Sequence, residues 1–396
     1  MKGKERLLIG RMGFSVLVFS FLLFGAGRVS LQAAETIKIG AVLAVTGWAG
    51  SMGSYQKEGL TIAAEDVNNK GGVLGRKIEL FIEDDQSNPT NAAVAATKLI
   101  RDKKVSLVIG STITVMCMPM IPIFEQEQVP NISLGAGHEI TVPLKKWVYR
   151  VPLTDYRLSP EMLKFTSKTL GGKKIALLSS TDATGMMGAK GVLDNAEKYG
   201  ITLVANEKFD PKDTSMVPQL TKIKAANPEY IILYTSAGPA SVVAKNWQQL
   251  GMETVVIGSH GVPTGDFVRI AGKIVDNGRW VLFGSKDNYA EQLPPGDPYR
   301  KETYEPFMKA LKEKYGKTEY QAPYGTGNTA MYLAAHALKI AGTDDRAALR
   351  DALEKVHFPN GLIGEYRYSP TDHDGLAGEA YGPIILKDSK WWAYKK

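Results

Sequence analysis

The feature that most constrains the fold is an alternation of short apolar runs with amphipathic stretches, which begins at Glu35. The apolar runs are rich in β-branched residues and nearly continuous, as in strands that are buried on both faces of a parallel sheet. The stretches between them have the spacing of amphipathic helices. Strands that alternate with helices predict an α/β fold in which helices cover both faces of the sheet.

This alternation occurs in two series, which predicts two doubly wound parallel-sheet lobes. The predicted strands are 37–45, 77–85, 105–110 and 129–135 in the first series, and 173–180, 201–209, 229–235 and 254–259 in the second. The predicted helices are 53–72, 90–104, 185–199, 216–226, 239–250, 300–315 and 327–341. Long helical segments dominate after 278–284, and the tail from residue 364 is strand-like. At 396 residues, the chain is long enough for two full cores.

The first 34 residues have a different composition and predict a secretory signal peptide. A basic head precedes the apolar run Met12–Gly27, and small residues follow at Ala33 and Ala34. The rival interpretation is a retained membrane anchor, for which the apolar run is short. Cleavage near Ala33 predicts a periplasmic protein.

Charge and cysteine content exclude several functions. Residues 1–33 carry five basic residues and one acidic residue, so the net charge of +7 falls to +3 once they are removed. This modest charge, without a basic cluster, argues against binding of nucleic acid. Cys117 is the only cysteine, so no disulfide can form within the chain, and we expect a small buried side chain.

The residues that follow each predicted strand are the candidates for a binding site. In open parallel sheets, ligands lie beyond the carboxyl ends of the strands, and two facing lobes would enclose a ligand cleft there. The segment "VIGSTITVMCMPMIP" (108–122) places three hydroxyl side chains at such an end. The helix after them would offer free N–H groups to an anion. Its two prolines, Pro119 and Pro122, must lie in first turns or bend the helix.

At these junctions the sequence resembles the leucine/isoleucine/valine-binding proteins of bacterial ABC importers. The resemblance rests on "IKIGAVLAVTGWAGSMG", "AAEDVNNKGGVLGRKIELFIEDDQSNP", "VIGSTITVMCMPMIPIFEQEQVPNIS" and "IGEYRYSPTDHDG". It implies a type I periplasmic binding fold with three crossings between the lobes. We assign 35–153 and 283–362 to lobe 1, and 154–282 and 363–396 to lobe 2. It also implies partners: a small-molecule ligand and a membrane permease with its ATPase subunits, with the binding protein itself a monomer.

The resemblance implies which residues hold the ligand. In that family a hydroxyl after the third strand and donors after the fourth hold a carboxylate, so Thr114 and the backbone of Gly135–Gly137 are expected there. Turn capping is the alternative role of Thr114. The complete set of candidate residues is Trp48, Met52, Thr112, Thr114, Gly135, Ala136, Gly137, Thr184, Ser236, His260, Gly261 and Tyr324.

Three departures from the family pattern bear on the ligand. Gly137 stands where the family commonly has threonine, and His260 stands where a glutamate usually holds the ligand's α-ammonium. Thr184 and Ser236 replace aromatic residues. A histidine supplies one acceptor when neutral and repels an ammonium when protonated. We therefore expect a carboxylate without an α-ammonium, such as an aromatic or other apolar acid, with a branched-chain amino acid as the alternative.

Other functions find little support in the sequence. The acidic sets 83–85 and 372–374 lack the spacing of a metal site, and "GSHG" (258–261) lacks the frame of a hydrolase elbow. We expect no cofactor, no metal and no catalysis. A secreted enzyme would need a nucleophile or metal, whereas a ligand-sensing subunit of a signalling receptor would share the cleft. A repressor is disfavoured because a signal peptide occupies the place of a DNA-binding headpiece.

Overall fold

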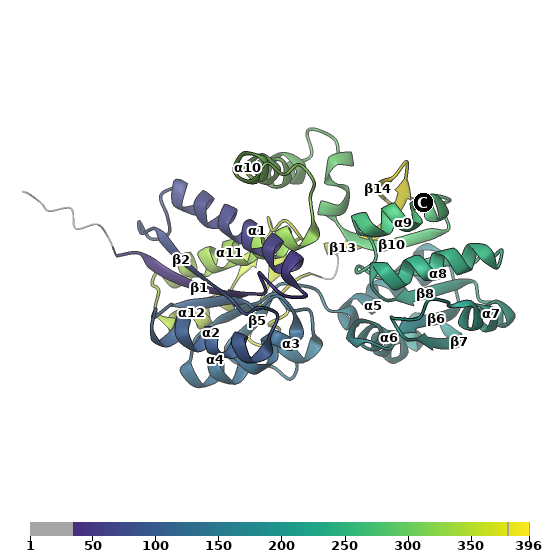
Figure 1. Ribbon diagram of the computed structural model, residues 1–396, viewed down its shortest axis with the longest axis horizontal. Coiled ribbons are helices and arrows are strands. Elements are labelled where there is room, and N and C mark those ends of the chain that lie inside the picture. Colours follow the sequence, from purple (N-terminus) through teal and green to yellow (C-terminus); the bar gives the residue numbers. More distant parts are fainter. Residues whose placement is uncertain (1–34, 378–379, 396) are drawn as a thin grey trace, which may run out of the picture. The chain divides into compact units, whose positions relative to one another are not determined.

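The computed structural model of the protein describes residues 35–377 and 380–395. The predicted signal peptide (1–34) lies outside the described residues. Two large sheets and one two-stranded ribbon form, with helices on both faces of each large sheet (Figure 1). The predicted α/β class with two lobes is confirmed.

The first sheet, in lobe 1, has five parallel strands in the order β2-β1-β3-β4-β5. Its strands are β1 (Ile37–Leu43), β2 (Ile78–Asp84), β3 (Leu107–Gly110), β4 (Asn131–Ser133) and β5 (Val148–Arg150). Alternate residues of β1 enter different cores: Ile39 packs with α1 and α11, and Val42 packs with α2. This burial on both faces explains why the strand sequence is continuously apolar.

The helices of lobe 1 come from distant parts of the sequence. They are α1 (Gly50–Asn69), α2 (Pro89–Arg101), α3 (Thr114–Cys117), α4 (Ile121–Glu127), α10 (Glu305–Tyr315), α11 (Ala322–Ala341) and α12 (Arg346–Leu353). Asn88 caps α2, since its side chain accepts hydrogen bonds from the N–H groups of Thr90 and Asn91. Pro89 occupies the first helical position, where its missing N–H costs nothing.

The second sheet, in lobe 2, has seven strands in the order β14-β13-β10-β9-β8-β6-β7. Its strands are β6 (Lys174–Ser180), β7 (Thr202–Phe209), β8 (Tyr230–Tyr234), β9 (Val255–Gly258), β10 (Trp280–Ser285), β13 (Tyr381–Lys387) and β14 (Lys390–Ala393). Its helices are α5 (Asp155–Lys164), α6 (Ala183–Asn195), α7 (Val217–Ala226), α8 (Ala237–Gln249) and α9 (Gly265–Val275). The strand-like tail adds β13 and β14 as antiparallel strands, which the expectation of a parallel sheet did not include.

The chain passes between the lobes three times. It leaves lobe 1 after β5, returns to it after β10, and enters lobe 2 again at β13. The ribbon of β11 (His357–Phe358) and β12 (Tyr366–Arg367) lies on the last passage, where Tyr366 Oη donates to the carbonyl of Val151 at 2.8 Å. The exact lobe boundaries proposed from the sequence stay a prediction.

The segment after β3 runs through three short helical pieces. Thr114 begins α3, a 3-10 turn covers Met118–Met120, and α4 follows. Pro119 and Pro122 each lie in the first turn of a piece, as their missing N–H groups require. Met116 and Met120 are buried in a core cluster of lobe 1, so these two methionines have a packing role.

Several short elements escaped the sequence analysis, among them β5, β11, α5, α9 and α12. Strand β5 is short and contains a charged residue, Arg150, so it lacks the apolar run of the other strands.

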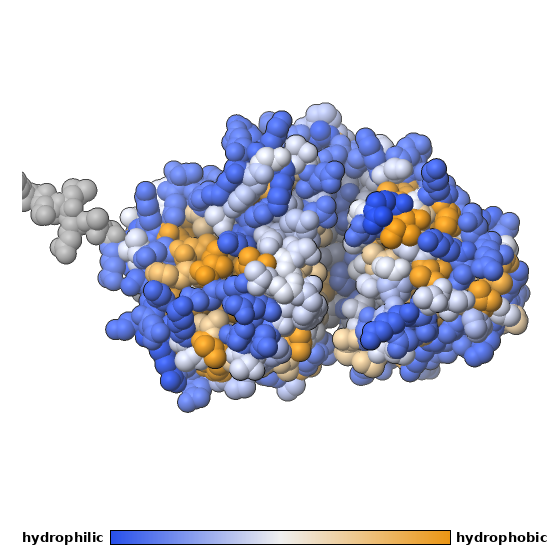
Figure 2. All heavy atoms as spheres, in the orientation of Figure 1, coloured by the Kyte–Doolittle hydropathy of each residue, from blue (hydrophilic) through white to orange (hydrophobic). Residues whose placement is uncertain are grey.

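The surface is mainly hydrophilic on the face shown in Figure 2, with apolar residues in small patches. Among residues 35–377 and 380–395, no helix has both the length and the apolar character to cross a membrane.

Candidate functional site

The hydroxyl groups that follow β3 serve different purposes. Ser111 Oγ donates a 2.5 Å hydrogen bond to Asp85, and Thr112 Oγ1 accepts from the backbone N–H of Ala44 at 3.0 Å. Both hydroxyl residues are buried. They tie the end of β3 to the ends of β2 and β1. Thr112, which was predicted to contact the ligand, therefore also has a structural role.

Thr114 and Gly137, the two principal candidates for binding a carboxylate, are in direct contact. The N–H of Gly137 donates to Thr114 Oγ1 at 2.9 Å. Thr114 also begins a short helix, and both residues are partly exposed. A carboxylate that displaced this contact could accept a hydrogen bond from each group.

The absence of a side chain at Gly137 is linked to the presence of Thr114. A Cβ atom at position 137 would lie 2.3 Å from Thr114 Cγ2 and 2.9 Å from a carboxylate oxygen of Glu139. The family's threonine at this position therefore does not fit here beside Thr114. The chain keeps the backbone donor and gives up the side-chain donor.

A buried arginine, which the sequence analysis missed, holds the Gly137 peptide from the other side. Arg150 Nη1 donates to the carbonyl of Gly137 at 2.5 Å, and its guanidinium pairs with Asp374. Arg150 is completely buried, and this burial lowers its pKa. Arg157 pairs with Asp372 at 2.9 Å and with Asp374 at 3.2 Å.

The acidic set 372–374 is therefore part of an ion-pair network that orients the peptide of Gly137. Asp374 lies between the two arginines and also accepts from the hydroxyl of Thr141. Within the described part of the chain, no group of three or more histidine, cysteine or acidic residues could hold a metal ion.

Gly135 and Ala136 complete the loop after β4. Gly135 is buried and donates its N–H to Ser133 Oγ at 3.3 Å, whereas Ala136 is exposed. A Cβ atom on Gly135 would lie 2.8 Å from Cys117 Sγ, so only glycine allows this close packing. Burial raises the pKa of Cys117 to about 11, consistent with the inert apolar residue expected.

The three predicted apolar contacts differ in exposure. Trp48 and Met52 are 70% and 40% exposed, and the Trp48 indole donates to the carbonyl of Ser87 at 3.2 Å. Tyr324 is only 1% exposed and packs against Tyr55, with ring centroids 4.9 Å apart. The structure thus places Tyr324 in an aromatic core, while Trp48 and Met52 remain accessible for a ligand.

In lobe 2, His260 and Gly261 follow the carboxyl end of β9, as predicted. His260 Nδ1 lies 3.6 Å from Asp155 Oδ1, and neither atom makes a hydrogen bond within the described residues. The ring of Tyr381 packs edge-on against the imidazole, with centroids 5.2 Å apart. Burial lowers the pKa of His260 to about 4 and raises the pKa of Asp155 to about 8.

The sequence analysis missed Asp155 because it missed helix α5. Asp155 is the first residue of that helix, after the cap Thr154, whose side chain accepts from the N–H of Arg157. A threonine cap followed by an acidic residue is a helix-start pattern and could have located both. Asp155 is only 6% exposed.

Thr184 and Ser236 lie at the starts of helices that follow strands of lobe 2. Thr184 is in the first turn of α6, whose cap Asp182 accepts from the N–H of Gly185 at 3.0 Å. Ser236 is the exposed N-cap residue of α8, and its side chain makes no capping hydrogen bond. Their contact with a ligand stays a prediction.

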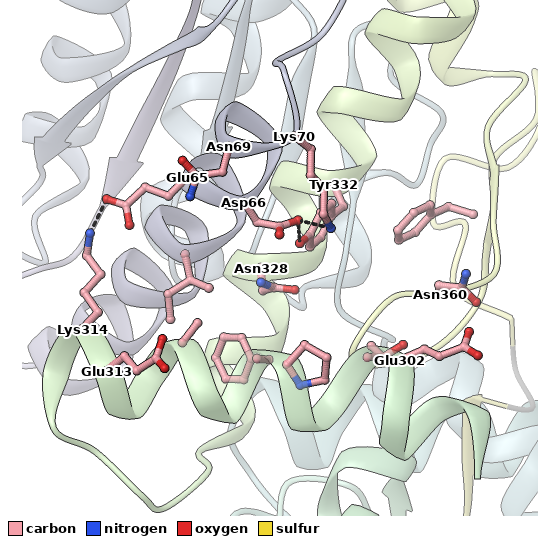
Figure 3. Close-up of a pocket in the computed structure, with 16 residues that line it drawn as sticks. Glu65, Asp66, Asn69, Lys70, Glu302, Glu313, Lys314, Asn328, Tyr332 and Asn360 are labelled. Atoms are coloured by element: carbon pink, nitrogen blue, oxygen red, sulfur yellow. Dashed lines mark hydrogen bonds and ion pairs between the residues drawn. The ribbon is translucent and has the colours of Figure 1, made fainter. Parts of the chain in front are cut away.

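A separate pocket of about 630 Å³ lies between α1, α10 and α11 (Figure 3). Four of its six charged lining residues are paired with one another: Asp66 pairs with Lys70 at 2.7 Å, and Glu65 pairs with Lys314. Tyr332 donates to Asp66 at 2.7 Å. None of the twelve predicted site residues lines this pocket.

Comparison with known proteins identifies the family. A family model described as "Periplasmic binding protein" matches residues 36–381. The leucine-, isoleucine-, valine-, threonine- and alanine-binding protein of Pseudomonas aeruginosa is 27% identical over 370 residues, which are 92% of each chain. The Leu/Ile/Val-binding protein homolog 3 of Brucella melitensis is 25% identical over 341 residues, covering 85% of this chain and 88% of the relative.

Solved structures share the fold of this chain. An extracellular ligand-binding receptor from Rhodopseudomonas palustris HaA2 has a TM-score of 0.76 and 28% identity, covering 91% of this chain and 100% of that one. The substrate-binding protein LivJ of Streptococcus pneumoniae, in complex with isoleucine, has a TM-score of 0.72. At 21% identity, over 91% of this chain and 98% of that one, LivJ shows the fold alone.

These matches confirm the resemblance inferred from the sequence. The relatives are solute-binding proteins and not enzymes, and members of the family are periplasmic. The match spans both lobes and most of the length of the relatives. The chain therefore belongs to the periplasmic binding protein family and is related to the branched-chain amino-acid-binding proteins of ABC importers.

Proposed function

We propose that this protein is exported, captures a small carboxylate and delivers it to the permease of an ABC importer. The observation that carries this proposal is the contact between Thr114 Oγ1 and the N–H of Gly137 at the strand ends of lobe 1. An anion that takes both donors would gain charge-assisted hydrogen bonds. Arg150 supports the site by holding the Gly137 carbonyl, which keeps the N–H of this loop in place.

Capture in this proposal involves no covalent chemistry. The ligand first binds lobe 1, and closure of lobe 2 removes it from water and strengthens each hydrogen bond. The permease then distinguishes the loaded, closed form from the open form, because only a difference in affinity between two states can shift their populations. We propose that the protein acts as a periplasmic monomer in this cycle.

Two classes of ligand fit this proposal. The first is an aromatic or other apolar acid without an α-ammonium, because His260 stands where the resemblance implies a glutamate. The second is an amino acid, and the buried carboxylate of Asp155 beside His260 favours it, since a carboxylate can pair with an ammonium. The names of the Pseudomonas and Brucella relatives agree with this second class.

A thermal-shift panel of amino acids and aromatic acids tests carboxylate capture. Ligands that bind the folded form should raise its melting temperature as their concentration increases. The substitution Thr114→Val keeps the shape of the side chain and removes the hydroxyl, so affinity for the best carboxylate should fall by 10-fold or more, about 1.5–3 kcal/mol. Thr202→Val, at an exposed position at the start of β7, is the matched control.

The proposal fails if no carboxylate stabilises the protein, or if both threonine variants bind it equally well. A ligand-sensing role for a signalling receptor would need the same capture site. Uptake of the identified ligand by cells with and without the gene for this protein distinguishes the two, because loss of a sensor alone would leave uptake unchanged.

A further inference from the structure

The pocket between α1, α10 and α11 has the size and the charge of a second binding site. Its volume of about 630 Å³ lies in the range of sites that hold small molecules. Four acidic side chains and two lysines carry the charge of its lining. This excess of negative charge favours a cation. The pocket therefore suits a ligand of opposite charge to the carboxylate that we propose for the strand ends.

The acidic side chains lie at both ends of the pocket. Figure 3 shows Glu302 at one end and Glu65 and Glu313 at the other. Glu302 belongs to the helical turn Arg300–Tyr304, which continues into α10, so a rise of about 1.5 Å per residue separates Glu302 and Glu313 by about 16 Å. Glu302 makes no ion pair among the residues that the structure describes, and Glu313 only approaches Lys309, at 3.9 Å. Both end carboxylates can therefore accept a cation.

A buried acceptor lies between these two ends. Asn328 lines the pocket and is only 4% exposed (Figure 3). Its Nδ2 donates to the carbonyl of Gly59 at 3.4 Å, which fixes the orientation of the amide because a carbonyl can only accept. No described residue donates a hydrogen bond to Asn328 Oδ1. Buried polar atoms are almost always satisfied, so this oxygen indicates a donor from a ligand or a water.

The walls of the pocket are partly apolar. Ile62 of α1 and Phe307 and Ala310 of α10 contribute to its lining. Methylene groups can pack against these side chains, and an ammonium group is attracted to the face of an aromatic ring. The pocket thus combines carboxylates at its ends, apolar surface along its walls and a hydrogen-bond acceptor in its middle.

We propose that this pocket binds a linear polyamine, whose terminal ammonium groups pair with Glu302 and Glu313 and whose inner N–H donates to Asn328 Oδ1. An extended tetraamine has a length comparable to the separation of the two carboxylates along α10. All of these residues belong to lobe 1, so this site does not depend on the proposed capture of a carboxylate. A polyamine in this pocket would connect α10 to α11 and stabilise lobe 1.

Calorimetric titration of the purified protein with spermine at physiological salt tests the proposal. The matched probe is 1,12-diaminododecane, which has the same number of chain atoms and the same terminal ammonium groups but no inner nitrogen. Spermine should bind at a single site and about 10-fold or more tightly than this diamine, because only spermine can donate to Asn328. Asn328→Ala should reduce this preference by at least about 5-fold, as measured in a cycle of two proteins and two ligands.

Removal of the end carboxylates tests the terminal contacts. The double variant Glu302→Gln with Glu313→Gln keeps the size of both side chains and should weaken spermine by about 10-fold. The matched control is Glu253→Gln, an exposed glutamate of lobe 2 that pairs with Arg279, and it should bind spermine within about 2-fold of the original protein.

Three results would overturn the inference. Spermine may give no binding heat, or the double variant and Glu253→Gln may bind it equally well, which would indicate general attraction between charges. If Asn328→Ala weakens spermine and the diamine equally, the assignment of a polyamine is wrong. Melting curves of each variant separate a loss of affinity from a loss of folded protein, and the double variant tests the site at exposed positions if Asn328→Ala does not fold.

Discussion

The two halves of the candidate site differ in how their polar groups are satisfied. In lobe 1, Thr114 Oγ1 already accepts from Gly137, and the Gly137 carbonyl already accepts from Arg150. In lobe 2, Asp155 Oδ1 and His260 Nδ1 face each other without a hydrogen bond. One half is therefore pre-organised by the protein alone, whereas the other needs an added group to complete it.

This difference suggests that the two halves contribute differently to binding. A pre-organised half binds with little loss of conformational freedom and supplies affinity for any carboxylate that fits. A half with unsatisfied acceptors penalises ligands that cannot donate to them, so it supplies selectivity. The predictions below test this contrast in order of decreasing effect.

The largest effect is expected for Arg150, which supports the pre-organised half. Arg150→Met removes a buried partner of Asp374 and the donor to the Gly137 carbonyl, while Arg157 still pairs with Asp374. The free energy of unfolding should therefore fall by about 3 kcal/mol, the lower end of the cost of breaking a buried ion pair. Denaturant titration measures this loss. Arg269→Met, which removes an exposed pair with Asp266, should change stability by less than about 1 kcal/mol. A similar, small change in both variants would show that the Arg150 network is not needed.

A threonine at position 137 should disturb the same half through packing. Its Cβ atom would lie 2.3 Å from Thr114 Cγ2, so Gly137→Thr should cost about 1–3 kcal/mol of stability and weaken carboxylate binding. The double variant Gly137→Thr with Thr114→Ser removes the clashing methyl group. It should recover much of the lost stability in a double-mutant cycle. Strictly additive losses would contradict the proposed coupling of the two positions.

Asp155 should make stability depend on pH. Its pKa rises from 3.8 to about 8 on folding, so the folded form retains the proton longer and stability falls as pH rises towards 8. The pKa of His260 falls from 6.5 to about 4, which acts in the opposite direction below pH 6.5. Of these two groups, only Asp155 acts between about pH 6.5 and 8, at up to about 1.4 kcal/mol per pH unit.

Asp155→Asn should remove this slope, which denaturant titrations at pH 6.5, 7.2 and 8.0 would measure without ligand. The variant should then be more stable than the original protein at pH 8.0, and Asp266→Asn should keep the original slope. An unchanged slope in Asp155→Asn would mean that Asp155 is solvated or paired, and the contrast between the two halves would fail.

The sequence predicted those helices and strands whose formation depends on neighbouring residues in the chain. The apolar runs located β1 and β6, and the helical spacing of 90–104 located α2. Arg150 could not be recognised as a core residue, because its burial depends on Asp374, which is distant in the sequence. The resemblance placed Thr114 and Gly137 in one candidate site, and the two residues are in contact in the structure.

The lobe 2 half of the site was harder to predict, because the environment of its residues depends on contacts between different helices and strands. His260 was chosen from the resemblance, but its neighbour Asp155 lies on a helix that the periodicity did not identify. We expected a ligand without an α-ammonium from His260 alone, because the sequence had not indicated the neighbouring carboxyl group of Asp155. Tyr324 was placed among the ligand contacts as an aromatic residue, whereas its ring packs against Tyr55 in the core.

The smallest effect on stability is expected at Trp48, on the accessible side of the pre-organised half. Its side chain is 70% exposed and makes one hydrogen bond to the Ser87 carbonyl, so Trp48→Ala should change the free energy of unfolding by about 0.5 kcal/mol or less. If the indole closes over an apolar ligand, affinity should still fall by about 10-fold, since burial of an aromatic face contributes about 1–2 kcal/mol. Trp392→Ala, at a 40% exposed position in β14, controls for the loss of a surface tryptophan. Equal affinity in the original protein and in Trp48→Ala would show that Trp48 does not contact the ligand. Selectivity for the shape of the ligand would then depend on the other contacts.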